Sequence, residues 1–197
     1  MALPGFFEGA EMPASGWWEA LWPEPARVLS QVGIEHGMTV IDLCAGDGWF
    51  TLPIAKLARM VYAIDIDARL LEKSRVRLRE AGFANCRFVE GDAYDIAGLV
   101  SEPADFAFLA NALHSVPDKS RLAKAVHAGL KPCGLFAVVN WYAKSREETL
   151  VLGEPRGPAT ELRMTHSDTA KAIEPAGFTM VDYMKVSPYH YAALFQR

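Results

Sequence analysis

The stretch that decides the fold runs from residue 39 to residue 48 and reads TVIDLCAGDG. Its first five residues, Thr39 to Leu43, form a short apolar run typical of a buried strand, and the small residues after them predict a tight turn. The apolar segment 49–60 is expected to form a helix. Pro53 is compatible with the first turn of that helix, where a missing N–H has no partner within the helix. The stretch therefore predicts a strand, a tight turn and a helix.

The same alternation of strand-like and helix-like segments continues along the chain. Further strands are expected at 61–66, 86–90, 106–109 and 135–141, and helices at 68–81 and 121–130. Asp67 is the expected N-cap of the first of these helices, and Gly82 marks its end. The turn Lys131-Pro132-Cys133-Gly134 is expected to end the second helix. Strand 135–141 is apolar almost throughout, which predicts a central position buried on both faces.

Two segments depart from this alternation. Residues 1–24 are rich in Trp, Pro and Gly and are expected to form an extended arm or a short helix. Residues 142–165 form a polar connection, and a helix capped by Ser167 is expected over 167–176. The chain closes with two strand-like stretches, 178–186 and 189–195, whose short link predicts an antiparallel hairpin. The whole chain, 1–197, is therefore expected to be a single α/β domain. Its sheet is predicted to be Rossmann-like, doubly wound, mostly parallel and seven-stranded, with the hairpin at its C-terminal end.

Composition narrows the classes of function. The 197 residues are 51% hydrophobic and 22% charged, which excludes intrinsic disorder as a description of the whole chain. A net charge of −4 makes nucleic acid a disfavoured partner. The three cysteines are widely spaced and suit free thiols in a reducing compartment, so a cytoplasmic protein is expected. The N-terminus lacks the features of a secretory signal, and no apolar run is long enough to span a bilayer, so no membrane partner is expected.

Acidic side chains follow three successive strands of the predicted sheet. In an open α/β sheet, ligands bind beyond the carboxyl ends of the strands. Asp42 offers a carboxylate to a cation, Asp65 is positioned to accept both hydroxyls of a ribose, and Asp92 lies where an exocyclic amine could be read. The small residues of the first turn allow a ligand close to the backbone. Three carboxylate side chains in these positions predict a pocket for an adenosine that carries an ammonium group and a sulfonium group.

Four motifs then give the chain a family resemblance. It resembles the class I S-adenosylmethionine-dependent methyltransferases of the small-molecule type, from about Gly33 through Trp141 and again over the C-terminal hairpin. The motifs and the residues on which they lie are as follows: D-x-G-x-G-x-G on Asp42, Cys44, Gly46 and Gly48; the acid after the second strand on Asp65, followed by Ile66; G-D-A on Gly91, Asp92 and Ala93; and L-K-P-G-G on Leu130 to Gly134. Cys44 and Cys133 each replace a glycine of these patterns.

The resemblance implies S-adenosyl-L-methionine as the cofactor and assigns roles to the matching residues. It implies that Asp42 reaches the methionine ammonium, that Gly46 and Gly48 make room for the cofactor, that Asp65 holds the ribose and that Asp92 meets the adenine. The full set of expected cofactor-binding residues is Asp42, Cys44, Ala45, Gly46, Gly48, Asp65, Ile66, Asp92, Ala93 and Asn111. No cluster of His, Cys and carboxylate residues suggests a metal.

The candidate for proton transfer is His114, just beyond the fourth strand, because histidine accepts a proton near neutral pH. The alternative is catalysis by proximity alone, with no dedicated base. Other candidates for the pocket are His166, Tyr142, Tyr189 and His190, whereas His36 and His127 are expected on the surface or in packing. The tryptophans of the N-terminal arm, Trp17, Trp18 and Trp22, are expected either to pack or to form a lid over the site.

The predicted function is methyl transfer from S-adenosylmethionine to a small-molecule acceptor by in-line displacement, in a monomer or homodimer. The connection 142–165 and the arm would close over the acceptor. Two alternatives stay open at this point. One is a non-catalytic protein that keeps the fold and the cofactor. The other is a nicotinamide-dependent dehydrogenase, although Thr51 occupies the third glycine position of the dinucleotide fingerprint. The sequence NALH after the fourth strand differs from the NPPY of DNA amino-methylating enzymes.

Overall fold

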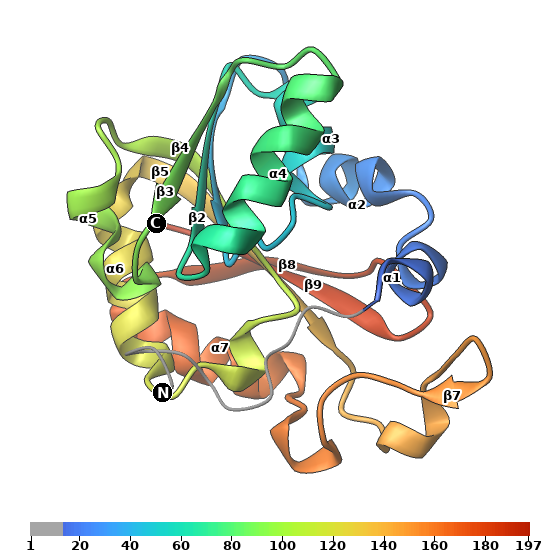
Figure 1. Ribbon diagram of the computed structural model, residues 1–197. Helices are drawn as coiled ribbons and strands as arrows, with labels where there is room; N and C mark the ends of the chain where they lie inside the picture. Colours follow the sequence, from blue (N-terminus) through green and yellow to red (C-terminus); the bar gives the residue numbers. More distant parts are fainter. Residues whose placement is uncertain (1–13) are drawn as a thin grey trace.

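Seven strands form one sheet in the computed structural model, which describes residues 14–197 (Figure 1). The strands are β1 Thr39–Leu43, β2 Met60–Asp65, β3 Cys86–Glu90, β4 Ala104–Ala110, β5 Leu130–Trp141, β8 Thr179–Lys185 and β9 His190–Gln196. Their order is β3-β2-β1-β4-β5-β9-β8. The first five are parallel, and β9 and β8 are antiparallel additions after β5. The predicted doubly wound sheet with a C-terminal hairpin is confirmed.

Helices cover both faces of this sheet. On one face lie α2 Pro25–Val32, α3 Thr51–Leu57 and α4 Ala68–Glu80, and on the other α5 Ile96–Leu99, α6 Lys119–Gly129 and α7 His166–Ile173 (Figure 1). Each face has its own cluster of buried apolar side chains. Every residue of β1 is buried, and so are the last six of β5. Burial on both faces explains why these strands are apolar almost throughout, as predicted for 135–141.

The helix after the first strand is shorter than the predicted 49–60. It spans Thr51–Leu57, with residues 49 and 50 in the preceding turn and Met60 already in β2. Its end is fixed from elsewhere in the chain, because the Asn85 amide donates hydrogen bonds to the carbonyls of Ala55 and Ala58, each at 2.9 Å. A helix end that is satisfied by a distant side chain leaves little trace in its own sequence.

The predicted turn at 131–134 is a bulge inside a strand. Ala104 of β4 pairs with Leu130 of β5, whereas Phe106 pairs with Leu135, so the intervening residues loop out while the strand continues on both sides. Cys133 adopts a positive φ of 62° within this loop. Lys131 Nζ anchors it with a 2.7 Å ion pair to the Asp105 carboxylate. The prediction found the irregularity but not the pairing around it.

The seventh helix begins earlier than predicted. Its N-cap is Thr165, not Ser167: Thr165 Oγ1 accepts the Asp168 N–H at 3.1 Å, and the Asp168 carboxylate accepts the Thr165 N–H at 3.3 Å. This reciprocal capping box satisfies two N–H groups, whereas Ser167 lies exposed in the first turn. The helix ends at Ile173, and a short 3₁₀ turn, Glu174–Ala176, completes the predicted range.

The two irregular segments have structure of their own. A short helix, α1 Ser15–Leu21, forms part of the N-terminal arm, and the arm's first 13 residues lie outside the described part of the chain. The connection 142–165 contains a small antiparallel pair, β6 Leu150–Val151 and β7 Glu154–Pro155, between two 3₁₀ turns, Arg146–Glu148 and Thr160–Leu162. None of the helices in residues 14–197 is long and apolar enough to cross a membrane.

Candidate functional site

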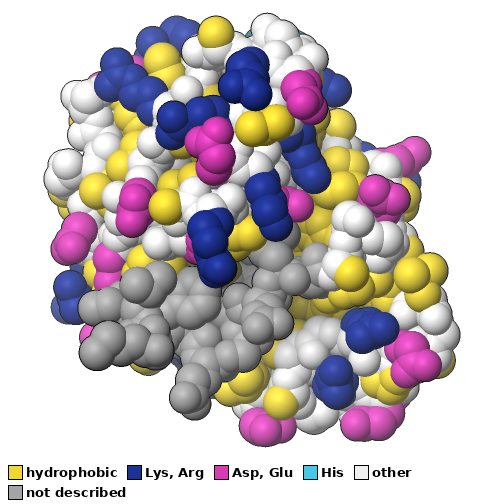
Figure 2. Space-filling view, in the orientation of Figure 1, with side chains coloured by type: hydrophobic (Ala, Val, Ile, Leu, Met, Phe, Trp, Pro, Cys, Tyr) yellow, Lys and Arg dark blue, Asp and Glu magenta, His cyan; other side chains and the backbone are white. Residues whose placement is uncertain are grey.

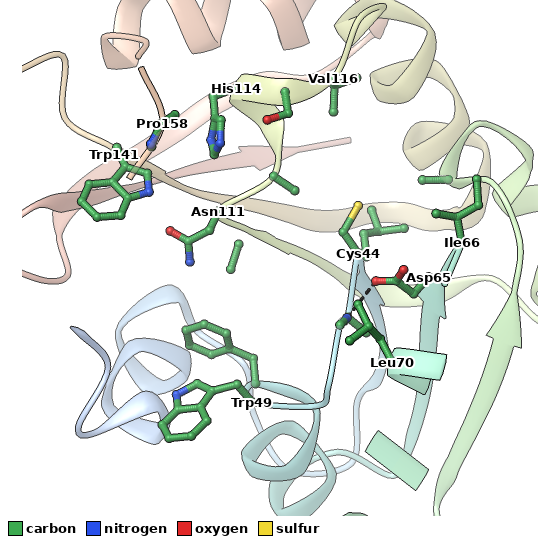
Figure 3. Close-up of a pocket in the computed structure, with 18 of the residues that line it drawn as sticks. Cys44, Trp49, Asp65, Ile66, Leu70, Asn111, His114, Val116, Trp141 and Pro158 are labelled. Carbon is green, nitrogen blue, oxygen red and sulfur yellow. Dashed lines mark hydrogen bonds between the residues drawn. The ribbon is translucent and has the colours of Figure 1, made fainter. Parts of the chain in front are cut away.

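A cavity of about 600 Å³ opens at the carboxyl ends of the central parallel strands (Figure 3). It brings together ten of the eleven predicted site residues. These are Asp42, Cys44, Ala45, Gly46, Asp65, Ile66, Asp92, Ala93, Asn111 and His114. The remaining one, Gly48, does not line it. A Cβ on Gly48 would lie 2.3 Å from the Ser74 hydroxyl oxygen, so this glycine makes room for helix α4.

Asp65, at the end of β2, is fixed by the first strand-to-helix turn. Its carboxylate accepts the Gly46 N–H at 2.8 Å and the Asp67 N–H at 2.9 Å. Burial raises the pKa of Asp65 even though both hydrogen bonds favour the charged form. The side chain is 9% exposed and borders the cavity. Its position and orientation are therefore set before any ligand binds.

Asp42, at the next strand, is more deeply buried, with 3% of its surface exposed. The Thr51 hydroxyl donates a 2.6 Å hydrogen bond to its carboxylate. Burial outweighs this hydrogen bond and raises the pKa of Asp42 to about 7, and the neighbouring charge of Asp65 adds to the shift. A carboxylate so poorly compensated by the protein is suited to a cationic ligand, which would stabilise its charged form.

Backbone strain marks the ends of two neighbouring strands. Cys44 follows β1 with a φ of 54°, and Asn111 follows β4 with a φ of 58°. Non-glycine residues adopt this left-handed conformation only where the surrounding structure enforces it, often at functional sites. The side-chain amide of Asn111 is buried, and neither its nitrogen nor its oxygen has a hydrogen-bond partner among the described residues. Figure 3 shows this amide in the middle of the cavity, which fits a polar ligand there.

His114 contributes a neutral imidazole. Its Nδ1 lies 3.3 Å from the Asn140 side-chain oxygen, and the same oxygen accepts the Trp141 N–H at 3.0 Å. Because this oxygen is an acceptor, we assign the proton to Nδ1, which leaves Nε2 as an acceptor. Burial lowers the pKa of His114 to about 4, and the Asn140 hydrogen bond only partly opposes it.

The other predicted pocket candidates lie outside the cavity lining. His190 is fully buried, with Nδ1 2.8 Å from the Ser187 hydroxyl oxygen and its ring between Trp22 and Trp141. The others, Tyr142, His166 and Tyr189, do not border the cavity either. His36 is exposed, and His127 packs edge-on against Phe178, as expected for surface and packing residues.

The N-terminal tryptophans divide between the two expected roles. Trp17 and Trp18 line the cavity, whereas Trp22 is 2% exposed and packs edge-on against Phe50 with ring centroids 5.4 Å apart. Helix α1 therefore covers the cavity with one part and joins the core with another. The described residues contain no group of three or more His, Cys, Asp or Glu side chains arranged to hold a metal ion.

Sequence reasoning expected the connection 142–165 over the acceptor but named none of the residues that form the far wall of the cavity. Trp141, at the end of β5, borders it, and so do Arg146, Arg156 and Pro158 of the connection. A tryptophan at the carboxyl end of a central parallel strand was a usable signal, because ligands bind at that edge. The connection offered no signal, because its arginines follow no motif. The lining also includes Trp49 and Leu70.

The family follows from comparison with known proteins. A family model described as a methyltransferase domain matches residues 34–173, which is most of the chain. The chain belongs to this family. The methyltransferase domain spans all five parallel strands and ends with α7, so it includes every predicted site residue.

Curated relatives of this methyltransferase domain are similar at modest identity. An uncharacterised methyltransferase of Synechocystis sp. is 26% identical over 162 residues, covering 78% of this chain and 72% of that protein. The ubiquinone/menaquinone biosynthesis C-methyltransferase UbiE of Escherichia coli is 26% identical over 181 residues, with 79% and 72% covered. The demethylmenaquinone methyltransferase of Staphylococcus aureus is 29% identical over 112 residues, and the match spans 45% of its length.

A solved structure supports the fold of the methyltransferase domain. The crystal structure of a SAM-dependent methyltransferase from Aquifex aeolicus superposes with a TM-score of 0.77 at 20% identity, covering 94% of this chain and 99% of that one. At this identity the likeness concerns the architecture of the sheet and its helices, and it agrees with the strand order described above.

Proposed function

We propose that this methyltransferase domain transfers a methyl group from S-adenosylmethionine to a small-molecule acceptor. The observation that carries the proposal is the meeting of Asp42, Asp65 and Asp92 in one cavity, each just at or after the end of a different parallel strand. S-adenosylmethionine is cationic at its sulfonium and ammonium groups, and it carries a ribose diol. An acidic cavity wall complements all three groups.

The residues that line the cavity offer partners for the ammonium, the ribose and the adenine of this cofactor. Asp42, whose raised pKa marks an uncompensated carboxylate, would face the ammonium. Asp65 would accept the two ribose hydroxyls, because its oxygens are held by backbone N–H groups at the cavity edge. Asp92 and Ala93 would meet the adenine, with Ile66 beside them. The unsatisfied amide of Asn111 would gain a partner.

The reaction that this arrangement supports is an in-line displacement. Bound S-adenosylmethionine supplies a methyl group activated by its sulfonium. The chain's own contribution is to hold the acceptor in line with that methyl and to keep water away, for which the indole rings of Trp17, Trp18 and Trp141 line the cavity. His114 Nε2 would accept the proton that an acceptor O–H or N–H releases.

Two considerations support a small acceptor. The part of the cavity beyond the acidic wall is bordered by α1 and by the connection, which leaves room for a small molecule within about 600 Å³ in all. The E. coli relative is named as a C-methyltransferase of ubiquinone/menaquinone biosynthesis and the S. aureus relative as a demethylmenaquinone methyltransferase, which favours an acceptor that is not a macromolecule. The nicotinamide alternative is disfavoured, because Thr51 is buried, donates to Asp42 and begins α3 where the dinucleotide fingerprint requires glycine.

The proposal is tested by following the methyl group. Purified protein is incubated with S-adenosylmethionine labelled in its methyl group and with a bacterial extract separated into small molecules and macromolecules. We expect label in the small-molecule fraction only, and loss of the signal in Asp65→Asn. Asp95→Asn, outside the cavity lining, is the matched control and keeps wild-type transfer. Label in neither fraction, with intact cofactor binding, would favour the non-catalytic alternative, and label in macromolecules would contradict the small acceptor.

A further inference from the structure

The connection end of the cavity holds an excess of positive charge. Arg146 and Arg156 line the cavity, and Arg163 lies in the same connection, where it is 7% exposed. Six of the nine other arginines in residues 14–197 form ion pairs with Asp or Glu, whereas these three have no Asp or Glu carboxylate oxygen within 4.0 Å in that part of the chain. Figure 2 shows apolar side chains between the body of the molecule and the lobe that the connection forms.

The hydrogen-bonding capacity of these guanidinium groups is only partly used. Arg146 Nε donates to the Gly157 carbonyl at 3.1 Å, which orients the group and leaves its two terminal nitrogens available. Arg156 Nε is buried without a partner among the described residues, and so is Arg163 Nη1. Buried donors of a charged group are costly when unsatisfied, so a ligand that accepts their hydrogen bonds offsets that cost.

Acidic neighbours in the described part of the chain form no ion pair with these guanidinium groups. Glu147 and Glu148 directly follow Arg146, but both are exposed and neither lines the cavity. The Glu148 carboxylate instead accepts the Ser145 N–H at 3.1 Å. Burial lowers the pKa of the Arg163 guanidinium, and the charge of Arg146 adds to that effect, whereas the charges of Glu147 and Glu148 oppose it.

An aromatic side chain borders the same end of the cavity, with 2% of its surface exposed. The Trp141 ring borders the cavity, with the Arg163 guanidinium 5.1 Å from its ring centroid. Gly157 lets the connection approach this ring closely, because its φ is +90° and a Cβ there would lie 2.8 Å from Trp141. Arg163 also donates to the carbonyls of Pro158 and Arg156, at 3.2 and 3.0 Å. Arg163 therefore acts as a positioning residue that holds the Arg156 segment against Trp141.

We propose that the methyl acceptor bears a carboxylate, which binds Arg146 and Arg156 at the end of the cavity that Trp141 borders. This inference rests on the proposed function, because it concerns the acceptor of the same cavity. Guanidinium groups match carboxylates in geometry and give strong charge-assisted hydrogen bonds. The cofactor's own carboxylate is the competing occupant. Figure 3 shows Trp141 and Pro158 at one end of the cavity and Asp65 and Ile66 at the other.

The test uses two probes of the same shape, 4-hydroxybenzoate and its neutral amide, 4-hydroxybenzamide. Their binding to the full chain saturated with S-adenosylhomocysteine is measured by calorimetry or by quenching of tryptophan fluorescence. We expect the carboxylate to bind about tenfold more tightly than the amide, and this preference to disappear in Arg146→Gln and Arg156→Gln. Lys144→Gln removes one charge from an exposed site of the same connection and keeps the preference.

The affinity for S-adenosylhomocysteine is measured on every variant. It distinguishes a failure of this inference from a failure of the proposed function. The inference predicts the same affinity in wild type, Arg146→Gln and Arg156→Gln. A drop of about tenfold in either variant would assign the arginines to the cofactor's carboxylate and overturn the inference, while the proposed function would stand. Equal binding of both probes, or binding of neither, would also overturn it. Failure of the wild type to bind S-adenosylhomocysteine at all would instead contradict the proposed function.

Discussion

The two ends of the cavity differ in charge and in how the chain builds them. At one end, Asp42 and Asp65 stand on parallel strands of the sheet, with oxygens fixed by groups of the first strand-to-helix segment. At the other end, Arg146 and Arg156 belong to a connection that hydrogen-bonds largely to itself. The position of the acidic end is fixed by the topology of the sheet, whereas the position of the basic end depends on the local structure of the connection. We expect the first to govern cofactor binding and the second to govern the choice of acceptor.

The largest effect should come from the buried carboxylate of the acidic end. Because burial raises the pKa of Asp42 from its ordinary value of 3.8 to about 7, folding takes up a proton between these pH values. Asp42 therefore costs stability increasingly as pH rises through this window, and the cost is complete above pH 7. Asp42→Asn should raise the free energy of unfolding by about 4 kcal/mol at pH 8.

The pH dependence is the sharper part of this prediction. The gain from Asp42→Asn should shrink below pH 7 and vanish below about pH 3, where the wild-type side chain is neutral in both states. Denaturant unfolding at several pH values measures it, with Asp95→Asn as the control at an exposed carboxylate. A gain independent of pH, or a loss of stability at pH 8, would show that Asp42 is well compensated and would remove its role as an open cation site.

The next largest effect concerns His114 and the proton that the acceptor releases. His114→Gln should lower the rate of methyl transfer by about 100-fold for an acceptor that must lose a proton. Because the pKa of His114 is about 4, the wild-type rate should be constant above about pH 6 and should fall as pH decreases toward 4. Transfer of labelled methyl to the identified small molecule measures both.

The exposed His36 provides the matched control, since His36→Gln changes the same residue type away from the cavity. A His114→Gln rate equal to that of wild type would mean that positioning alone drives the reaction at this site, as in catalysis by proximity.

A smaller effect distinguishes the glycines that support each end. In Gly48→Ala the new Cβ would meet the Ser74 backbone of α4 at 3.1 Å, and in Gly157→Ala it would meet the ring of Trp141. Both positions have a positive φ. We expect Gly48→Ala to lower the free energy of unfolding by about 2 kcal/mol. Gly157→Ala should cost about 1 kcal/mol and weaken probe binding at the acceptor end, because a local connection can shift.

Thermal unfolding and the probe titration measure the two glycine variants side by side. Gly98→Ala, where nothing lies within 4 Å of the added Cβ, is the control. Equal losses of stability in Gly48→Ala and Gly157→Ala would contradict the distinction between a site built on the sheet and one built on the connection.

The acidic end was predictable from sequence, and the basic end was not, for a physical reason. A parallel sheet brings the carboxyl ends of its strands to one edge, so recognising three strands was sufficient to bring Asp42, Asp65 and Asp92 together. Arg146 and Arg156 reach the cavity only through the turns and hydrogen bonds of the connection, which have no periodic pattern. The Thr165 cap and the end of α3 were missed for the same reason. Each depends on a particular side-chain hydrogen bond, and the local sequence offers more than one residue that could make it.

Gly48 shows a limit of motif matching. The glycine is present at the expected position of the signature, yet its missing side chain accommodates Ser74 of α4. A residue type can thus be required by packing beside a site without contacting the ligand. Asn111 shows the opposite case. Its position after the fourth strand was the sequence feature that placed it at the site, and its amide, buried without a hydrogen-bond partner among the described residues, gives a structural reason for that prediction.

The most direct test of the division between the two ends is a calorimetric titration of S-adenosylhomocysteine into wild type, Asp65→Asn and Arg156→Gln, with thermal melting to establish that each is folded. We predict that Asp65→Asn weakens binding about 30-fold, because it removes the charged acceptor for the ribose hydroxyls, while Arg156→Gln binds as wild type does. Unchanged affinity in Asp65→Asn, or an equal loss in Arg156→Gln, would contradict the assignment of the cofactor to the acidic end.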